Sequence, residues 1–137
     1  METVDGEDLP SVPVYGDTGA GDAMEFFPGT PETFIRVLPQ YNFPGVAAFR
    51  VDGDSMEPTI LKGAYVGVVP FAGEITEGGV YLVYMPPFGR VIKRIRMGAD
   101  GTIVLHSDNS SYSPIPLPYE GYDKVVLGRV VWIWQLC

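Results

Sequence analysis

Turn-forming residues recur about every ten positions from residue 33 onward, and this spacing restricts the chain to short secondary-structure elements. The chain contains 17 Gly and 13 Pro, which favour turns and interrupt helices. The runs between them are rich in β-branched and aromatic residues, and Asp100-Gly101 separates two of these runs as a typical hairpin turn. We therefore predict a single all-β domain of sandwich or barrel type. The predicted strands span residues 33–38, 46–51, 64–69, 79–85, 90–97, 102–106 and 125–134.

Acidic residues are concentrated at the N-terminal end of the 137-residue chain. Residues 1–35 contain eight Asp or Glu and no Lys or Arg, whereas residues 36–137 contain nine acidic and nine basic residues. Residues 1–32 also show little periodicity apart from a short run at 12–15, so we interpret them as a mobile acidic arm and residues 33–137 as the folded domain. Because the arm would repel a phosphate backbone, this chain alone is a poor candidate for binding DNA or RNA.

The chain has one cysteine, Cys137, and one histidine, His106. An intrachain disulfide and a Cys/His zinc site are therefore excluded, and we predict neither a metal nor another cofactor. No apolar run approaches the roughly 18 residues that span a bilayer, and no signal peptide is visible. We therefore expect a cytoplasmic protein without membrane contact.

The final run, residues 125–134, is apolar on both alternating faces. A strand of a half-exposed antiparallel sheet should instead alternate apolar with polar residues. Two interpretations remain open for this run. It is either a central strand that is covered on both sides, or a strand with one face in a subunit interface.

Ser55 is a candidate nucleophile because it lies in a turn that directly follows a predicted strand. Gly53 turns the chain sharply at the end of that strand, and Pro58 prevents an immediate helix. Backbone N–H groups in the turn, those of Ser55 and Met56, can then point at a developing oxyanion. The alternative interpretation is a turn serine with a local hydrogen bond.

A nucleophilic serine needs a base, and the sequence offers a histidine and a lysine. His106 lies in a β-like run with no partner carboxylate implied, which favours a structural role. In the strand 90–97, alternation places Lys93 as the only charge on a face with Val91, Ile95 and Met97. Desolvation on an apolar face lowers a lysine pKa toward neutrality. Lys93 is therefore either a buried general base or a lysine that reaches solvent from a sheet edge.

Three ordered motifs resemble the catalytic domain of LexA-like self-cleaving repressors, the peptidase S24 family, and especially the C-terminal domains of phage repressors. These motifs are residues 53–59 (GDSMEPT), 91–94 (VIKR) and 108–114 (DNSSYSP). Ser55 and Lys93 are 38 positions apart, which is similar to the spacing in that family. The resemblance covers roughly residues 11–134. It implies a mostly β, single catalytic domain of short, strongly bent antiparallel strands with an N-terminal arm that carries the cleavage site.

The resemblance implies a Ser–Lys dyad, with Ser55 as the nucleophile and Lys93 as the general base. It also implies self-cleavage upstream of the serine, which we assign to the Ala20–Gly21 bond rather than interpreting these residues as a flexible linker. In this family, cleavage separates a DNA-binding half from a dimerising half, so operator affinity falls as avidity is lost. The implied partners are a second copy of the chain or a higher homo-oligomer, the RecA–single-stranded DNA filament as trigger, and operator DNA through an absent N-terminal domain.

Three other functions are compatible with parts of this pattern. No helix-turn-helix precedes the domain, so we expect either part of a longer repressor or a naturally short protein like UmuD, a self-processed accessory of translesion DNA synthesis. Signal peptidase I shares the Ser-Met-x-Pro-Thr motif and a lysine base, but it needs a membrane anchor, and residues 109–114 resemble the repressor motif instead. The third alternative is a non-catalytic dimerisation module in which Ser55 and Lys93 are present but unused.

Overall fold

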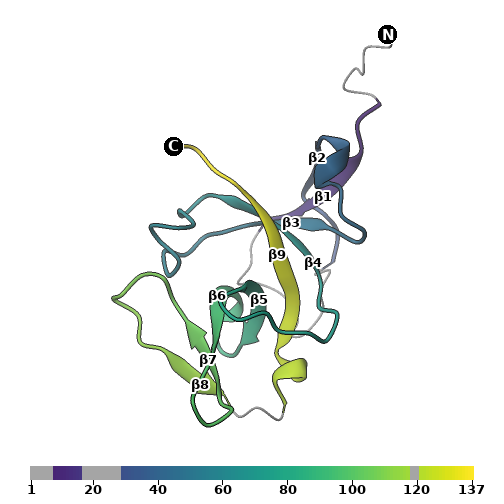
Figure 1. Ribbon diagram of the computed structural model, residues 1–137. Coiled ribbons are helices and arrows are strands. Elements are labelled where there is room, and N and C mark those ends of the chain that lie inside the picture. The colour runs from purple at the N-terminus through teal and green to yellow at the C-terminus, as the bar shows by residue number, and fades with distance from the viewer. Residues whose placement is uncertain (1–7, 17–28, 118–120) are drawn as a thin grey trace.

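The computed structural model describes residues 8–16, 29–117 and 121–137, and these residues form one nine-stranded sheet (Figure 1). The strand order is β2-β1-β3-β4-β9-β5-β6-β7-β8. Two short 3-10 helices, η1 (Pro39–Tyr41) and η2 (Tyr122–Lys124), connect strands. No helix among the described residues is long and apolar enough to cross a bilayer. The strands are β1 (Ser11–Tyr15), β2 (Thr33–Arg36), β3 (Ala47–Arg50), β4 (Tyr65–Pro70), β5 (Val80–Met85), β6 (Gly89–Met97), β7 (Ile103–His106), β8 (Ile115–Leu117) and β9 (Val126–Trp134).

All seven predicted strands are present, each with ends within two residues of the predicted bounds. The prediction of a mostly β domain is thus confirmed. The strands form a single sheet with β2 and β8 at its edges, and not the sandwich or closed barrel that the strand spacing suggested. Spacing along the chain indicates where strands lie, but it does not specify which strands pair.

Two strands lie where we expected none. β8 falls in the Pro-rich stretch that we interpreted as a break, and it contains Pro116. A proline, which lacks an N–H group, is tolerated there because β8 is the last strand of the sheet and pairs with β7 alone. Because of the turn-forming residues in this stretch, the sequence pattern did not indicate the edge strand β8.

The interpretation of residues 1–32 as a mobile arm is wrong for β1. Val12 and Val14 are 0% and 1% exposed and belong to a cluster of buried residues beneath β1 and β3. β1 pairs with β2 on one side and with β3 on the other. The short alternating run that we noted at residues 12–15 was therefore a strand signal, and the functional boundary at residue 32 stays a prediction.

The pairing of β1 with β3 is parallel, whereas the other pairs in the described sheet are antiparallel. Tyr15 is opposite Phe49 in this register, and the two rings stack with their centroids 5.4 Å apart. Parallel strands run toward the same end of a sheet. The segments that follow Tyr15 and Phe49 therefore leave the sheet at the same end, which is where the chain continues to Ser55.

The core consists of three groups of buried hydrophobic side chains. The first includes Phe49 of β3 and Leu82 of β5, and it also contains Met56 and Ile60, which follow Ser55 in the chain. The second lies among β5, β6, β7 and β9 and includes Tyr81. The third is the cluster beneath β1 and β3. Because Met56 and Ile60 are 2% and 0% exposed, the serine turn is anchored directly in the core.

β9 is the long yellow strand between β4 and β5 in Figure 1. Its first half is buried at Val126 and Gly128, which confirms the interpretation as a central strand. Its second half becomes progressively exposed, up to Trp134 at 62%. Trp132 lies across Gly67 of β4, where an added Cβ would be 2.1 Å from the indole ring. Only glycine leaves space for this tryptophan.

Candidate active site

The segment that carries Ser55 is a compact turn between β3 and β4. The N–H of Ile60 donates to the carbonyl of Met56 at 2.9 Å, and the N–H of Glu57 donates to the carbonyl of Asp54 at 3.1 Å. As predicted, the turn does not continue into a helix. Ser55 is half-buried at its start. The buried side chains that follow Ser55 hold the position of its backbone.

The Ser55 hydroxyl makes no hydrogen bond to any other residue that the structure describes. Within the same part of the chain, the backbone N–H groups of Ser55 and Met56 also have no acceptor. The interpretation of Ser55 as a turn serine with a local hydrogen bond is therefore not supported. An available hydroxyl beside two available amides is the arrangement that a nucleophile and an oxyanion site require.

Lys93 lies in β6 and is only 7% exposed. Its Nζ donates to Ser107 Oγ at 2.7 Å and lies 5.3 Å from the centroid of the Tyr112 ring. Tyr81 is the residue opposite Lys93 on β5. Burial lowers the pKa of Lys93 below its ordinary value, because the charged form loses hydration that a hydroxyl and an aromatic face replace only in part.

The predicted pattern of β6 is correct for the face of Lys93 but incomplete for the opposite face. Lys93 shares its face with Ile95, which is fully buried, whereas Met97 at the end of the strand is 45% exposed. On the opposite face, Arg90 and Ile92 are 1% and 4% exposed. Both faces of β6 are therefore buried, and both of its edges are paired, with β5 and with β7. A lysine that reaches solvent from a sheet edge is therefore excluded.

Residues 107–112 bring the serine turn and the lysine strand to one site. The N–H of Asn109 donates to the Ser55 carbonyl at 2.9 Å, and its Nδ2 donates to the Asp54 carbonyl at 3.0 Å. The Tyr112 hydroxyl donates to Asp54 Oδ1 at 2.5 Å. Ser107, the first residue of this segment, accepts the hydrogen bond of Lys93. The segment therefore contacts both proposed catalytic residues.

An ion pair lies directly beside this segment. Arg94 Nε and Nη2 donate to the two carboxylate oxygens of Asp108 at 2.9 and 2.8 Å, and Nη1 donates to the Gly78 carbonyl at 2.6 Å. The side chain of Thr59 lies near this carboxylate and helps to lower the pKa of Asp108. The Arg94 guanidinium holds the pKa of Asp108 at about 2, so this carboxylate is ionised throughout the neutral and alkaline range.

Comparison with known protein families identifies this architecture. The model that describes the Peptidase S24-like family matches residues 13–131 of the chain. The chain belongs to the peptidase S24 family. Among curated relatives, it is 30% identical over 125 residues to the LexA repressor of Frankia casuarinae, covering 90% of this chain and 46% of the relative. It is 31% identical over 100 residues to Repressor protein CI of Enterobacteria phage phi80, covering 73% of this chain and 41% of the relative. The chain thus spans less than half the length of the curated relatives it matches.

The other candidate bases of this S24 domain form no hydrogen bond to Ser55 within the described residues. His106, at the end of β7, is opposite Arg94 in the sheet, and within the described residues its imidazole forms no hydrogen bond to Ser55. Lys62 and Lys124 are exposed, as expected. Among the lysines, only Lys93 combines burial with a contact to the segment that holds Ser55.

Sequence reasoning missed three contributors to the site. Ser107 had no assigned role, although it directly precedes the third motif, and Asp108 and Arg94 were quoted in motifs without a function. The sequence signals were weak: Arg94 directly follows Lys93, Ser107 directly precedes the third motif, and Asp108 is its first residue. Their contacts depend on the pairing of β6 with β7, which the strand pattern does not specify.

The predicted scissile bond has no described position, because Ala20 and Gly21 lie outside the described residues.

Among the described residues, no group of three or more His, Cys, Asp or Glu side chains is arranged to hold a metal ion.

Proposed function

We propose that this S24 domain is the self-cleaving and dimerising part of a transcriptional repressor of the phage or SOS type. The observation that carries the proposal is the buried Lys93 ammonium, hydrogen-bonded to a segment that also binds the backbone of Ser55. Both curated relatives are repressors, which favours this role over a UmuD-like accessory or a signal peptidase.

The proposed reaction is an acyl transfer followed by hydrolysis. Neutral Lys93 accepts the proton of the Ser55 hydroxyl as Oγ attacks the carbonyl carbon of Ala20, and the N–H groups of Ser55 and Met56 donate to the oxyanion. Lys93 then returns this proton to the amine of Gly21, which leaves, and Ala20 remains esterified to Ser55. Water attacks the ester with Lys93 again as base, the proton goes to Ser55 Oγ, and the new C-terminus at Ala20 is released.

The parallel pairing of β1 and β3 supports cleavage within one chain. Tyr15 and Phe49 are opposite each other, Ala20 follows Tyr15 by five residues, and Ser55 follows Phe49 by six. An extended chain advances about 3.3–3.6 Å per residue, so five residues can span up to about 18 Å. Both segments start at the same end of the sheet, so the cleavage segment begins on the side where the chain continues to Ser55.

Incubation of the purified chain from neutral to alkaline pH is expected to produce a fragment of 117 residues that begins with Gly21. Below the pKa of Lys93, the cleavage rate should rise about tenfold per pH unit, because only the neutral amine accepts a proton. The rate should level off below about 10.4, the ordinary lysine pKa, since burial lowers the pKa of Lys93. Intact mass measured over time at each pH checks this prediction.

The same pH profile separates the two candidate bases. A histidine base would give a rate that levels off near about 6.5, the ordinary pKa of the residue type, and that stays flat in the alkaline range. A folded chain that remains intact at every pH would contradict self-cleavage by this domain. A cut at another position would support self-cleavage but would show that Ala20–Gly21 is not the scissile bond.

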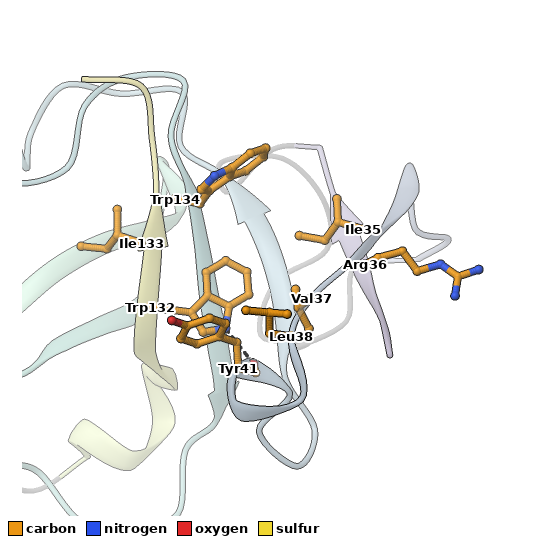
Figure 2. Close-up of a pocket in the computed structure, with 8 residues that line it drawn as sticks. All are labelled: Ile35, Arg36, Val37, Leu38, Tyr41, Trp132, Ile133 and Trp134. Carbon is orange, nitrogen blue, oxygen red and sulfur yellow. Dashed lines mark hydrogen bonds between the residues drawn. The ribbon is translucent and has the colours of Figure 1, made fainter. Parts of the chain in front are cut away.

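We also propose that the chain dimerises through the exposed half of β9. A groove of about 660 Å³ opens beside this half of the strand, and Figure 2 shows Trp132 and Trp134 on its wall, opposite Val37 and Leu38. Trp132 Nε1 donates to the Tyr41 carbonyl at 3.0 Å, which keeps that indole in place. An apolar patch of this kind on a domain surface is typical of a subunit interface. The residues that line the groove are Ile35, Arg36, Val37, Leu38, Tyr41, Trp132, Ile133 and Trp134.

Trp134→Glu is expected to convert the dimer to a monomer, weakening self-association at least about 30-fold, because it places a charge on an aromatic anchor of the interface. Sedimentation velocity over a range of concentrations measures this effect. Phe88→Glu is the matched control, since Phe88 is similarly exposed, at 68% against 62%, in the turn between β5 and β6. Equal self-association of both variants would contradict this interface.

The remaining partners belong to the repressor as a whole. We infer that operator DNA binds a part of the repressor that this chain does not cover, because the relatives are more than twice as long as the matched region. We also infer a cytoplasmic location and a RecA–single-stranded DNA filament as the trigger. The filament would favour the conformation in which the cleavage segment is docked, and would supply no catalytic residue.

A further inference from the structure

The carboxylate of Asp108 connects the two halves of the proposed catalytic site. It accepts two hydrogen bonds from Arg94, the residue that directly follows Lys93 in β6. It also lies near the side chain of Thr59, in the same turn as Ser55, which helps to lower the pKa of Asp108. One ionised side chain is therefore bound to the strand of the lysine and lies close to the turn of the serine.

The geometry of this link is restrictive. A guanidinium that meets both oxygens of a carboxylate forms two parallel hydrogen bonds, which fix orientation as well as distance. The third nitrogen of Arg94 is held by the Gly78 carbonyl at 2.6 Å. The two side chains are 22% and 13% exposed, so this pair is screened by solvent less than an ordinary surface pair.

The neighbours of Asp108 in the chain are the two residues that contact the dyad. Ser107 accepts the hydrogen bond of Lys93 Nζ at 2.7 Å. Asn109 donates its N–H to the Ser55 carbonyl at 2.9 Å. A rotation of the backbone at Asp108 would therefore displace the lysine partner and the serine partner together.

We propose that the Arg94–Asp108 ion pair is a positioning device. It holds the Ser55 turn in the position relative to Lys93 that proton transfer between Ser55 and Lys93 requires. Neither residue is a catalytic residue, because each acts through its neighbours. This inference rests on the proposed self-cleavage. It adds that the rate depends on a bidentate ion pair beside the dyad, and that this dependence is separate from the stability of the fold.

Asp108→Asn is expected to lower the plateau rate of self-cleavage about 10- to 100-fold, because small displacements of reacting groups have effects of this size. The pH at which the rate is half its plateau should stay the same, because burial and not the charge of Asp108 shifts the pKa of Lys93, and Asp108 itself does not titrate in this range. The rates are measured by intact mass at a temperature well below the melting temperature of each variant. A pair that only stabilised the fold would lower the melting temperature and leave the plateau rate unchanged.

Arg94→Lys is the second variant. It keeps the positive charge but lacks the planar guanidinium that binds both carboxylate oxygens of Asp108. It is expected to slow cleavage at least about tenfold, because an ammonium cannot hold both carboxylate oxygens and the Gly78 carbonyl in the same geometry. The double variant should cleave no more slowly than the slower single variant, as expected for residues that act as one unit. If Asp108→Asn does not fold, the result for Arg94→Lys decides.

Glu77→Gln is the matched control. Glu77 approaches Arg96 of the same strand at 3.7 Å, but both side chains are more than half exposed, and this variant is expected to cleave within about twofold of the unaltered chain. Plateau rates of Asp108→Asn and Arg94→Lys equal to that of the unaltered chain would overturn this inference and leave the proposed function intact. An unaltered chain that never cleaves would overturn both.

Discussion

Lys93→Met is expected to slow self-cleavage at least about 10³-fold and to leave the chain folded. Methionine has a similar length and fills the same buried position, without the cost of burying an ammonium. It has no group that can accept the proton of Ser55. Ser55→Ala should cause a loss of the same size, because the two residues act as one unit. The measurement is the time course of intact mass at the pH of the plateau, together with the melting temperature.

Two further variants test the chemical interpretation. Lys93→Arg retains a cation, but a guanidinium stays protonated at any accessible pH, so this variant should be as inactive as Lys93→Met. Lys62→Ala is the control at an exposed lysine and should cleave normally. Unchanged rates in both Ser55→Ala and Lys93→Met would show that the dyad is assigned wrongly.

Phe49→Ala is expected to destabilise the domain by about 3–5 kcal/mol, the usual cost of removing a buried aromatic ring. Phe49 is 0% exposed, lies in the first core cluster and stacks on Tyr15. The loss is a large part of the 5–15 kcal/mol of a typical domain, so the melting temperature should fall by at least about 10 °C. Thermal unfolding followed by circular dichroism provides the measurement.

Phe34→Ala is the matched control for this change. Phe34 lies on the edge strand β2 and is 61% exposed, so removing its ring should change the free energy of unfolding by less than about 0.5 kcal/mol. Equal destabilisation by the two substitutions would contradict the burial of Phe49. It would also weaken the argument that β1 and β3 leave the sheet at one end, because the ring of Phe49 joins these strands.

Much of the strand content could be predicted because it depends on local patterns. β6 illustrates this, since simple alternation placed Lys93 on the face of a buried isoleucine. β1 and β8 show where local reasoning fails. A five-residue and a three-residue strand, each with a proline, are too short to outweigh turn signals. Their existence depends on neighbouring strands that supply the hydrogen bonds and the buried surface.

The candidate site was predicted in part for the same reason. Ser55 was recognisable from its turn, and Lys93 was recognisable as a charge among apolar residues. The hydrogen bonds of Asn109 to Ser55 and Asp54 join residues more than 50 positions apart. No periodicity in the sequence encodes such contacts, because they form only when β6 and β7 are paired and the third motif folds back onto the serine turn.

The sequence by itself determined which residues we propose for catalysis, namely one serine in a tight turn and one lysine in an apolar strand. Only the tertiary structure decided what surrounds them. It placed β1 parallel to β3, buried both faces of β6, and paired the Asp108 carboxylate with Arg94. The physical reason is that side-chain alternation specifies the face of a strand, whereas strand order and long-range contacts depend on the packing of the whole sheet.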